Sequence, residues 1–203
     1  VEARVQFASL IAAKQDDAAA LYALALYLMD NNQFSLALDC GEKIARLAPS
    51  LNNAPRLLQM LRYPAFYADL VVAEAHANQM DPALYFALVR QESNFYPFST
   101  SSADARGLAQ IIPSTGREIA QRLGAQNFSL DQLYLPYISV KFGEWYLAQG
   151  LKQHREPIYA LAAYNAGDSR IARWKNGDVA ATVEEAFFRG FLHGQHNTLQ
   201  NIK

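Results

Sequence analysis

Glu92 is the residue whose type and setting best suit acid–base chemistry. It closes a strongly apolar segment, residues 83–89, and is followed by aromatic residues at Phe95, Tyr96 and Phe98. An apolar setting and the negative end of a helix dipole both disfavour a charged carboxylate, so we expect a raised pKa for Glu92. A carboxylic acid that stays protonated near neutral pH can donate its proton to a leaving oxygen. A solvated carboxylate at a helix end is the alternative interpretation.

The segment that carries Glu92 has the start signals of a helix. Asp81 is a good N-cap and Pro82 suits the first helical position, which predicts a central, buried helix over about residues 83–92. Residues 93–113 mix Ser, Thr, Gly and Pro with apolar side chains, which predicts a loop with room for a small hairpin. Helical patterns also cover residues 17–29, 34–47, 66–78, 114–123, 136–149 (ended by a glycine), 157–165 and 168–174, and the last 25 residues also read as helical.

The chain as a whole reads as all-α, because no long alternating strand pattern is present. In residues 1–62, two helical segments joined by a polar turn resemble one tetratricopeptide-like unit, either a helical hairpin or the remnant of an α-superhelix. Pro64 breaks the pattern, since proline disfavours helix in the residue before it. We therefore predict a helical segment over residues 1–62 and a catalytic domain over residues 63–203.

Composition excludes several other classes of protein. The 203 residues are 51% hydrophobic, which is typical of a globular protein with a core. The net charge of −1 argues against a broad basic surface for nucleic acids and against a polybasic patch for membranes. The single cysteine, Cys40, rules out an intrachain disulfide and reads as a buried small hydrophobe. His193 and His196 are the nearest approach to a metal pair, and solvated histidines are the favoured interpretation.

No membrane or targeting segment is evident in the sequence. The longest apolar run, residues 18–29, is shorter than the roughly 20 residues that cross a bilayer. The N-terminus lacks a basic head followed by an apolar block and a cleavage site, so no signal peptide is visible. The chain also lacks an initiator Met, which is typical of a mature or trimmed fragment.

Three motifs in order resemble those of the soluble lytic transglycosylases. The first is ALVRQESNF at residues 87–95, with a Glu-Ser pair at the end of a helix and an aromatic residue after it. The second is ARGLAQIIPST at residues 105–115, and the third is AAYNAG at residues 162–167. The resemblance implies a goose-type-lysozyme-like helical fold and the activity of a carbon–oxygen lyase acting on peptidoglycan.

The resemblance also implies roles for particular side chains. Glu92 is expected to be the catalytic acid and base, and Ser101 to orient that carboxylate or contact the sugar. Gln110 is expected to hydrogen-bond the substrate, Tyr164 to lie beside the bond that is cut, and Asn165 to hold that corner in place. Each has a plainer interpretation: Ser101 as a turn residue, Gln110 as a brace for its loop, Asn165 as a helix cap and Tyr164 as core.

The implied mechanism needs one carboxylate instead of the usual pair. Ordinary glycosidases place two carboxylates about 5–10 Å apart. Asp104 and Asp131 are candidates for a second catalytic carboxylate only because they are near in sequence. The favoured interpretation is that both are solvated charges in loops. In the family, the substrate's N-acetyl group assists departure of the leaving sugar. Glu92 then takes a proton from the 6-hydroxyl of the same N-acetylmuramic acid, and a 1,6-anhydro ring closes.

The sequence departs from the family pattern at two places. Ala109 stands where the family usually has Met, which we expect to remove a groove-lining side chain. In the C-terminal motif, residues 183–191, Gly190 falls where the family has a Glu that faces the site. Either Glu184 or Glu185 compensates, or the tail packs differently, or activity is weakened.

The leading hypothesis is therefore a lytic transglycosylase that cuts the bond between N-acetylmuramic acid and N-acetylglucosamine without a metal or organic cofactor. A hydrolytic muramidase and a non-catalytic glycan-binding scaffold are the alternatives. The expected partners are peptidoglycan glycan strands, with other cell-wall enzymes as a further class to consider and no nucleic acid. The substrate places the protein outside the cytoplasmic membrane, in the periplasm or cell-wall space.

Overall fold

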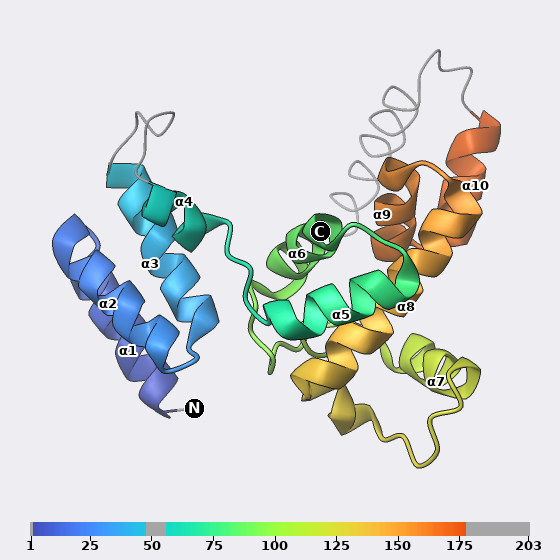
Figure 1. Ribbon diagram of the computed structural model, residues 1–203, viewed down its shortest axis with the longest axis horizontal. Coiled ribbons are helices and arrows are strands. Elements are labelled where there is room, and N and C mark those ends of the chain that lie inside the picture. Colours follow the sequence, from blue (N-terminus) through green and yellow to red (C-terminus); the bar gives the residue numbers. More distant parts are fainter. Residues whose placement is uncertain (1, 48–55, 178–203) are drawn as a thin grey trace, which may run out of the picture. The chain divides into compact units, whose positions relative to one another are not determined.

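The computed structural model describes residues 2–47 and 56–177 and is helical throughout, as predicted. The described residues contain no extended strand, only two isolated β-bridges between residues 100 and 111. The α-helices, labelled in Figure 1, are α1 Glu2–Ala13, α2 Ala18–Asp30, α3 Phe34–Leu47, α4 Arg56–Arg62, α5 Ala68–Asn78, α6 Pro82–Ser93, α7 Pro113–Arg122, α8 Pro136–His154, α9 Pro157–Ala166 and α10 Asp168–Gly177. A 3-10 helix, η2 Leu130–Tyr134, lies between α7 and α8 in the sequence.

The chain forms two compact units, residues 1–143 and 144–203, and α8 belongs to both. The domain boundary predicted near residue 62 falls inside the first unit, between α4 and α5, and stays a prediction. The helix predicted for the last 25 residues and the C-terminal motif at residues 183–191 lie outside the described residues. None of the described helices is long and apolar enough to cross a membrane.

The first three helices lie side by side (Figure 1). Asp17 starts α2 as predicted, because its carboxylate accepts a hydrogen bond from the backbone N–H of Ala20 at 3.0 Å. Gly41 allows α3 to approach α4, since a Cβ at this position would lie 3.0 Å from the Cβ of Leu61. Cys40 is fully buried, and that burial is the largest cause that raises the pKa of its thiol to about 12. The cysteine therefore behaves as the small buried hydrophobe that the sequence predicts.

Helix α6 begins as its sequence predicts. The Asp81 carboxylate accepts from the N–H of Ala83 at 2.9 Å, and Pro82 occupies the first turn. The expectation of burial all round is wrong, because Ala83 and Ala87 are exposed. One face alone packs inward, through Tyr85, Leu88, Val89 and Ser93.

In the second unit, α8 continues through Gly150 to His154, so the predicted helix end at this glycine is wrong. Gly150 lies against α9, where an added Cβ would meet Ala160 at 3.7 Å. Packing of α8 on α9 therefore outweighs the roughly 1 kcal/mol that a glycine costs inside a helix. The α9–α10 corner is held by a small core of Tyr159, Ala162, Ala163 and Ile171, with Ile158 against it.

Candidate active site

Glu92 is the penultimate residue of α6, and its carboxyl group is half-buried. Burial raises its pKa above the ordinary value of 4.5. Among the residues that the structure describes, no group donates a hydrogen bond to this carboxyl or forms an ion pair with it, so nothing there offsets the cost of desolvating the charge. The carboxyl is therefore suited to hold a proton and release it.

Ser93 fixes the end of α6 next to this carboxyl. Its hydroxyl, which is buried, donates to the carbonyl oxygen of Leu108 at 2.9 Å, with the carbonyl of Val89 at 3.2 Å as the alternative acceptor. Leu108 belongs to the second sequence motif. The first two motifs are thus tied together by a hydrogen bond from the residue that follows Glu92.

The second motif forms a tight loop that depends on Gly107. Its φ of +76° is one that glycine adopts readily, and a Cβ would lie 1.9 Å from the carbonyl oxygen of Leu133 and 2.8 Å from Oγ of Ser139. On either side of this glycine, Arg106 and Ile111 exchange backbone hydrogen bonds of 3.0 and 3.2 Å. This closed loop is the form that the predicted hairpin takes.

Gln110 braces this loop from within. Its backbone has a φ of +49°, and its side-chain Nε2 donates to the carbonyl oxygens of Ser99 at 3.1 Å and Gly107 at 3.0 Å. The amide nitrogen is therefore occupied by the loop, as in the plainer interpretation of this residue. The amide oxygen is the atom with which Gln110 could still bind a ligand, and that role stays a prediction.

Ser101 is exposed and directly precedes a turn at residues 102 and 103. Its Oγ accepts hydrogen bonds from the backbone N–H groups of Ala103 at 3.2 Å and Ala105 at 3.1 Å. Such contacts are typical of a serine that stabilises a turn. The hydroxyl hydrogen can still be donated to a ligand, so the predicted contact with a sugar stays a prediction.

Position 109 does not line a groove. Ala109 is fully buried, its N–H donates to Oγ of Ser139 at 3.1 Å, and a Cβ on Gly143 would lie 2.5 Å from the Cβ of Ala109. The expectation that the missing Met removes a groove-lining side chain is therefore wrong. The alanine fills a place where α8 and the loop are in close contact.

The two other carboxylates considered for catalysis are held by Arg106. Its guanidinium binds Asp104 through two hydrogen bonds, at 2.9 and 3.1 Å, and Asp131 through one at 2.8 Å. The hydrogen bond from Arg106 lowers the pKa of the Asp104 carboxyl. Arg106 therefore ties both aspartates into the loop, and the role of Glu92 as the proton donor stays a prediction.

Arg90, two residues before Glu92, connects α6 to the N-terminal helices. Its Nη2 lies 2.6 Å from the Glu42 carboxylate on α3, and its Nε donates to the carbonyl oxygen of Arg62 at 2.8 Å. The guanidinium also lies 5.1 Å from the centre of the Tyr63 ring. Charge-assisted hydrogen bonds of this length are among the stronger polar contacts in proteins. The helical segment before residue 62 is therefore attached to the helix that presents Glu92.

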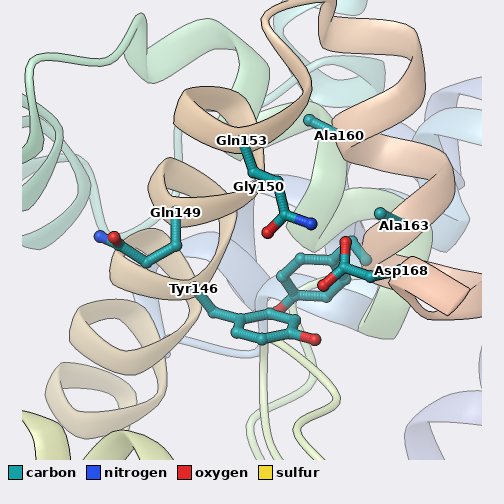
Figure 2. Close-up of a pocket in the computed structure, with 8 residues that line it drawn as sticks. Tyr146, Gln149, Gly150, Gln153, Ala160, Ala163 and Asp168 are labelled. Carbon is teal, nitrogen blue, oxygen red and sulfur yellow. The ribbon is translucent and has the colours of Figure 1, made fainter. Parts of the chain in front are cut away.

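Tyr164 and Asn165, the other two predicted site residues, lie in the second unit on α9. The ring centres of Tyr146 and Tyr164 are 5.3 Å apart, with the rings inclined at 66°. Both tyrosines line a small pocket of about 40 Å³, in which Figure 2 shows Gln149 and Gln153 of α8 and Asp168 at the start of α10. Tyr164 therefore lines a pocket that Gln149 and Gln153 also line, and Asn165 is exposed at the end of α9.

The structure adds supporting residues that the sequence analysis did not identify. Ser139 is fully buried, and its carbonyl oxygen accepts from the Tyr85 hydroxyl at 3.3 Å in addition to the contact with Ala109. Ser139 and Gly143 lie one helical turn apart on α8, so small residues at this spacing were the available signal. Glu144 is a further buried carboxyl residue on the same helix.

Metal chemistry finds no support in the described part of the chain, where no three His, Cys, Asp or Glu side chains gather as a metal site would require. His193 and His196 lie outside that part. His154 is instead paired with Asp168, with Nε2 and Oδ1 2.7 Å apart, and so joins the end of α8 to the start of α10. The expectation of a reaction without a metal or cofactor stays a prediction.

The helices define an all-α, lysozyme-like protein. The fold resembles the lytic transglycosylase Slt of Pseudomonas aeruginosa, solved as an inactive glutamate-to-glutamine mutant, with a TM-score of 0.69 and 26% identity over 84% of this chain and 26% of that one. It also resembles the 70 kDa soluble lytic transglycosylase of Escherichia coli, with a TM-score of 0.70 and 25% identity over 82% of this chain and 26% of that one.

The family model for the transglycosylase SLT domain matches residues 69–187, and the chain belongs to this family. The resemblance inferred from the three motifs is thereby confirmed. A soluble lytic murein transglycosylase of Salmonella typhimurium is 30% identical over 129 residues, which are 63% of this chain and 20% of that protein. The chain spans about a fifth of the length of the first curated relatives it matches.

Proposed function

We propose that this chain is a lytic transglycosylase that cleaves the glycan strands of peptidoglycan. The observation that carries the proposal is the half-buried Glu92 carboxyl with its raised pKa, held at the end of α6 beside the loop of the second motif. Membership of the SLT family supports the proposal, and so do relatives named as murein transglycosylases. The Pseudomonas aeruginosa protein supports a dependence on glutamate, since its inactive form carries glutamine in place of one.

The first chemical step uses Glu92 as an acid. Its proton passes to the glycosidic oxygen as the bond from C1 of N-acetylmuramic acid to that oxygen breaks, so N-acetylglucosamine leaves as a neutral alcohol. The carbonyl oxygen of the substrate's own N-acetyl group attacks C1 and takes the place of an enzyme nucleophile. Asp104 and Asp131 are engaged by Arg106, which is consistent with a reaction that needs no second carboxylate.

The second step uses the same carboxylate as a base. Glu92 accepts the proton of the 6-hydroxyl, whose oxygen bonds to C1 and displaces the acetamido oxygen. The product is a 1,6-anhydro end, and Glu92 returns to its acid form. Because the nucleophile belongs to the same sugar, its effective concentration is high and no activated water is required.

Glu92→Gln tests the proposal when it is combined with product analysis. The variant should lose release of soluble fragments from purified peptidoglycan while it still binds the glycan. Mass spectrometry of the wild-type products should show anhydro ends, which are one water (about 18 mass units) lighter than hydrolysed ends. Hydrolysed ends would identify a muramidase, and binding without any release by the wild type would identify a scaffold protein.

The substrate also determines the expected setting of the protein. Peptidoglycan lies outside the cytoplasmic membrane, so we propose action in the periplasm or cell-wall space, with glycan strands as the partner. Fractionation of cells that express the native gene, followed by detection with an antibody, would test this placement. Recovery of the protein only in the cytoplasm would contradict it.

A further inference from the structure

A second cavity, separate from Glu92, lies in the first unit between the N-terminal helices and the loop that follows α6. Its volume is about 420 Å³, within the roughly 300–1,000 Å³ of typical ligand pockets. Side chains from α1, from the α2–α3 turn and from the loop after α6 line it: Ala3, Arg4, Phe7, Tyr27, Asn31, Asn32, Gln33, Phe34, Ser35, Phe95, Tyr96, Pro97 and Phe98.

Four of the six aromatic side chains that line this cavity form two pairs. Phe7 of α1 and Tyr27 of α2 have ring centres 5.9 Å apart, and Tyr96 and Phe98 of the loop have ring centres 6.0 Å apart. Tyr27 is 53% exposed and Phe98 is 64% exposed, so large ring faces are open to solvent. Rings with one apolar face free and a polar neighbour are suited to a ligand that has both apolar and polar faces, as a sugar ring has.

Two asparagines of the α2–α3 turn, Asn31 and Asn32, also line the cavity. The Asn31 Nδ2 donates to the carbonyl oxygen of Tyr27 at 2.8 Å, which orients this amide and leaves its oxygen for a ligand. Asn32 has a φ of +55° and an exposed amide. Asn side chains offer both donors and acceptors, which suit hydroxyl and N-acetyl groups.

Among the residues that the structure describes, Arg4 is the only charged side chain that lines the cavity. Its guanidinium lies 3.9 Å from the centre of the Tyr96 ring, and its Nη2 donates to Oγ of Ser35 at 3.1 Å. These two contacts hold the guanidinium in place, and an Arg so held can bind a carboxylate with little loss of side-chain freedom. No carboxylate of the described part of the chain lines the cavity, which favours an anionic ligand.

We propose that this cavity is a second saccharide-binding site, which takes an N-acetylated glycan that bears a carboxylate. It rests on the proposed function, since a peptidoglycan strand carries both N-acetyl groups and the carboxyl groups attached to muramic acid. The aromatic pairs stack on the sugar rings, the amides bind the N-acetyl and hydroxyl groups, and Arg4 binds the carboxylate. The site holds a strand by a surface other than the one that cuts it.

Binding to the full chain carrying Glu92→Gln tests this proposal without interference from turnover. Isothermal titration should show two bound molecules of the tetrasaccharide with alternating N-acetylglucosamine and N-acetylmuramic acid. Adding Tyr27→Ala should weaken the second binding event about tenfold or abolish it, as loss of a central aromatic contact does. Tyr137→Ala is the matched control, because Tyr137 is also 53% exposed and lies outside the cavity.

Asn32→Asp gives a test that does not depend on removing packing. Aspartate has nearly the same shape and tolerates the positive φ, but adds a negative charge to the lining of the cavity that Arg4 also lines. It should weaken binding of the muramic-acid tetrasaccharide by a larger factor than binding of neutral chitotetraose. A single binding event in the parent, or two unchanged events with both Tyr27→Ala and Asn32→Asp, would overturn the proposal. Retained turnover by Glu92→Gln would instead refute the proposed function.

Discussion

Gly107→Ala is expected to be one of the most damaging small substitutions in this chain. Two costs combine at this position. The residue has a φ of +76°, and holding a non-glycine residue in the left-handed region costs about 1–2 kcal/mol. The added Cβ would also lie 1.9 Å from the Leu133 carbonyl oxygen, which is backbone and cannot rotate away. Overpacking of this kind costs about 1–3 kcal/mol.

We therefore expect Gly107→Ala to lower the free energy of unfolding by about 2–5 kcal/mol. Gly124→Ala is the control, because Gly124 has a similar φ of +66° but no atom within 4 Å of an added Cβ. It should cost only the conformational part, about 1–2 kcal/mol. Urea unfolding followed by far-UV circular dichroism measures both values. Equal losses in the two variants would refute the steric argument.

The same substitution also tests the link between the loop and Glu92. Leu108, the acceptor for the Ser93 hydroxyl, directly follows Gly107. A displaced loop should weaken that hydrogen bond and reduce turnover of peptidoglycan by more than the loss of folded protein explains. Gly124→Ala should reduce turnover only in proportion to the folded fraction. Full activity per folded molecule of Gly107→Ala would show that the loop does not position the end of α6.

Three further predictions follow from the contacts of the site. The raised pKa of Glu92 means that the folded protein keeps this proton to higher pH than the unfolded chain, so the free energy of unfolding falls as the pH rises from 4.5 towards the folded pKa. Glu92→Gln removes this loss, so the variant should be more stable than the wild type at about pH 7.5 and equally stable below about pH 4. Equal stability of the two proteins at both pH values would contradict the assigned pKa direction. The wild-type kcat/KM should decline as the pH rises, with a pKa above 4.5. Glu42→Gln should destabilise the fold by about 1 kcal/mol, because the pair with Arg90 is partly exposed, and a double-mutant cycle with Arg90→Gln that shows no coupling would refute the connection. Ser139→Ala should cost about 1 kcal/mol in urea unfolding through the lost hydrogen bond from the Ala109 N–H, and an unchanged unfolding midpoint would argue against that bond.

Much of the local structure could be predicted from the sequence. Asp17 and Asp81 begin their helices as expected, because capping depends on groups within three residues of each other. The prediction of a desolvated Glu92 agrees with its half-buried carboxyl and raised pKa. The family could also be predicted from the sequence, because three short motifs occur in the family's order.

Only the tertiary structure decided which surfaces these segments meet. Gly150 resembled a helix end, but it lies inside α8 because packing against Ala160 outweighs its poor helix propensity. Ala109 resembled a lost groove residue, but contact with Gly143, 34 positions along the chain, places it in the core. Local sequence governs turns and caps, whereas contacts between residues far apart in the chain depend on how complete helices fit against one another.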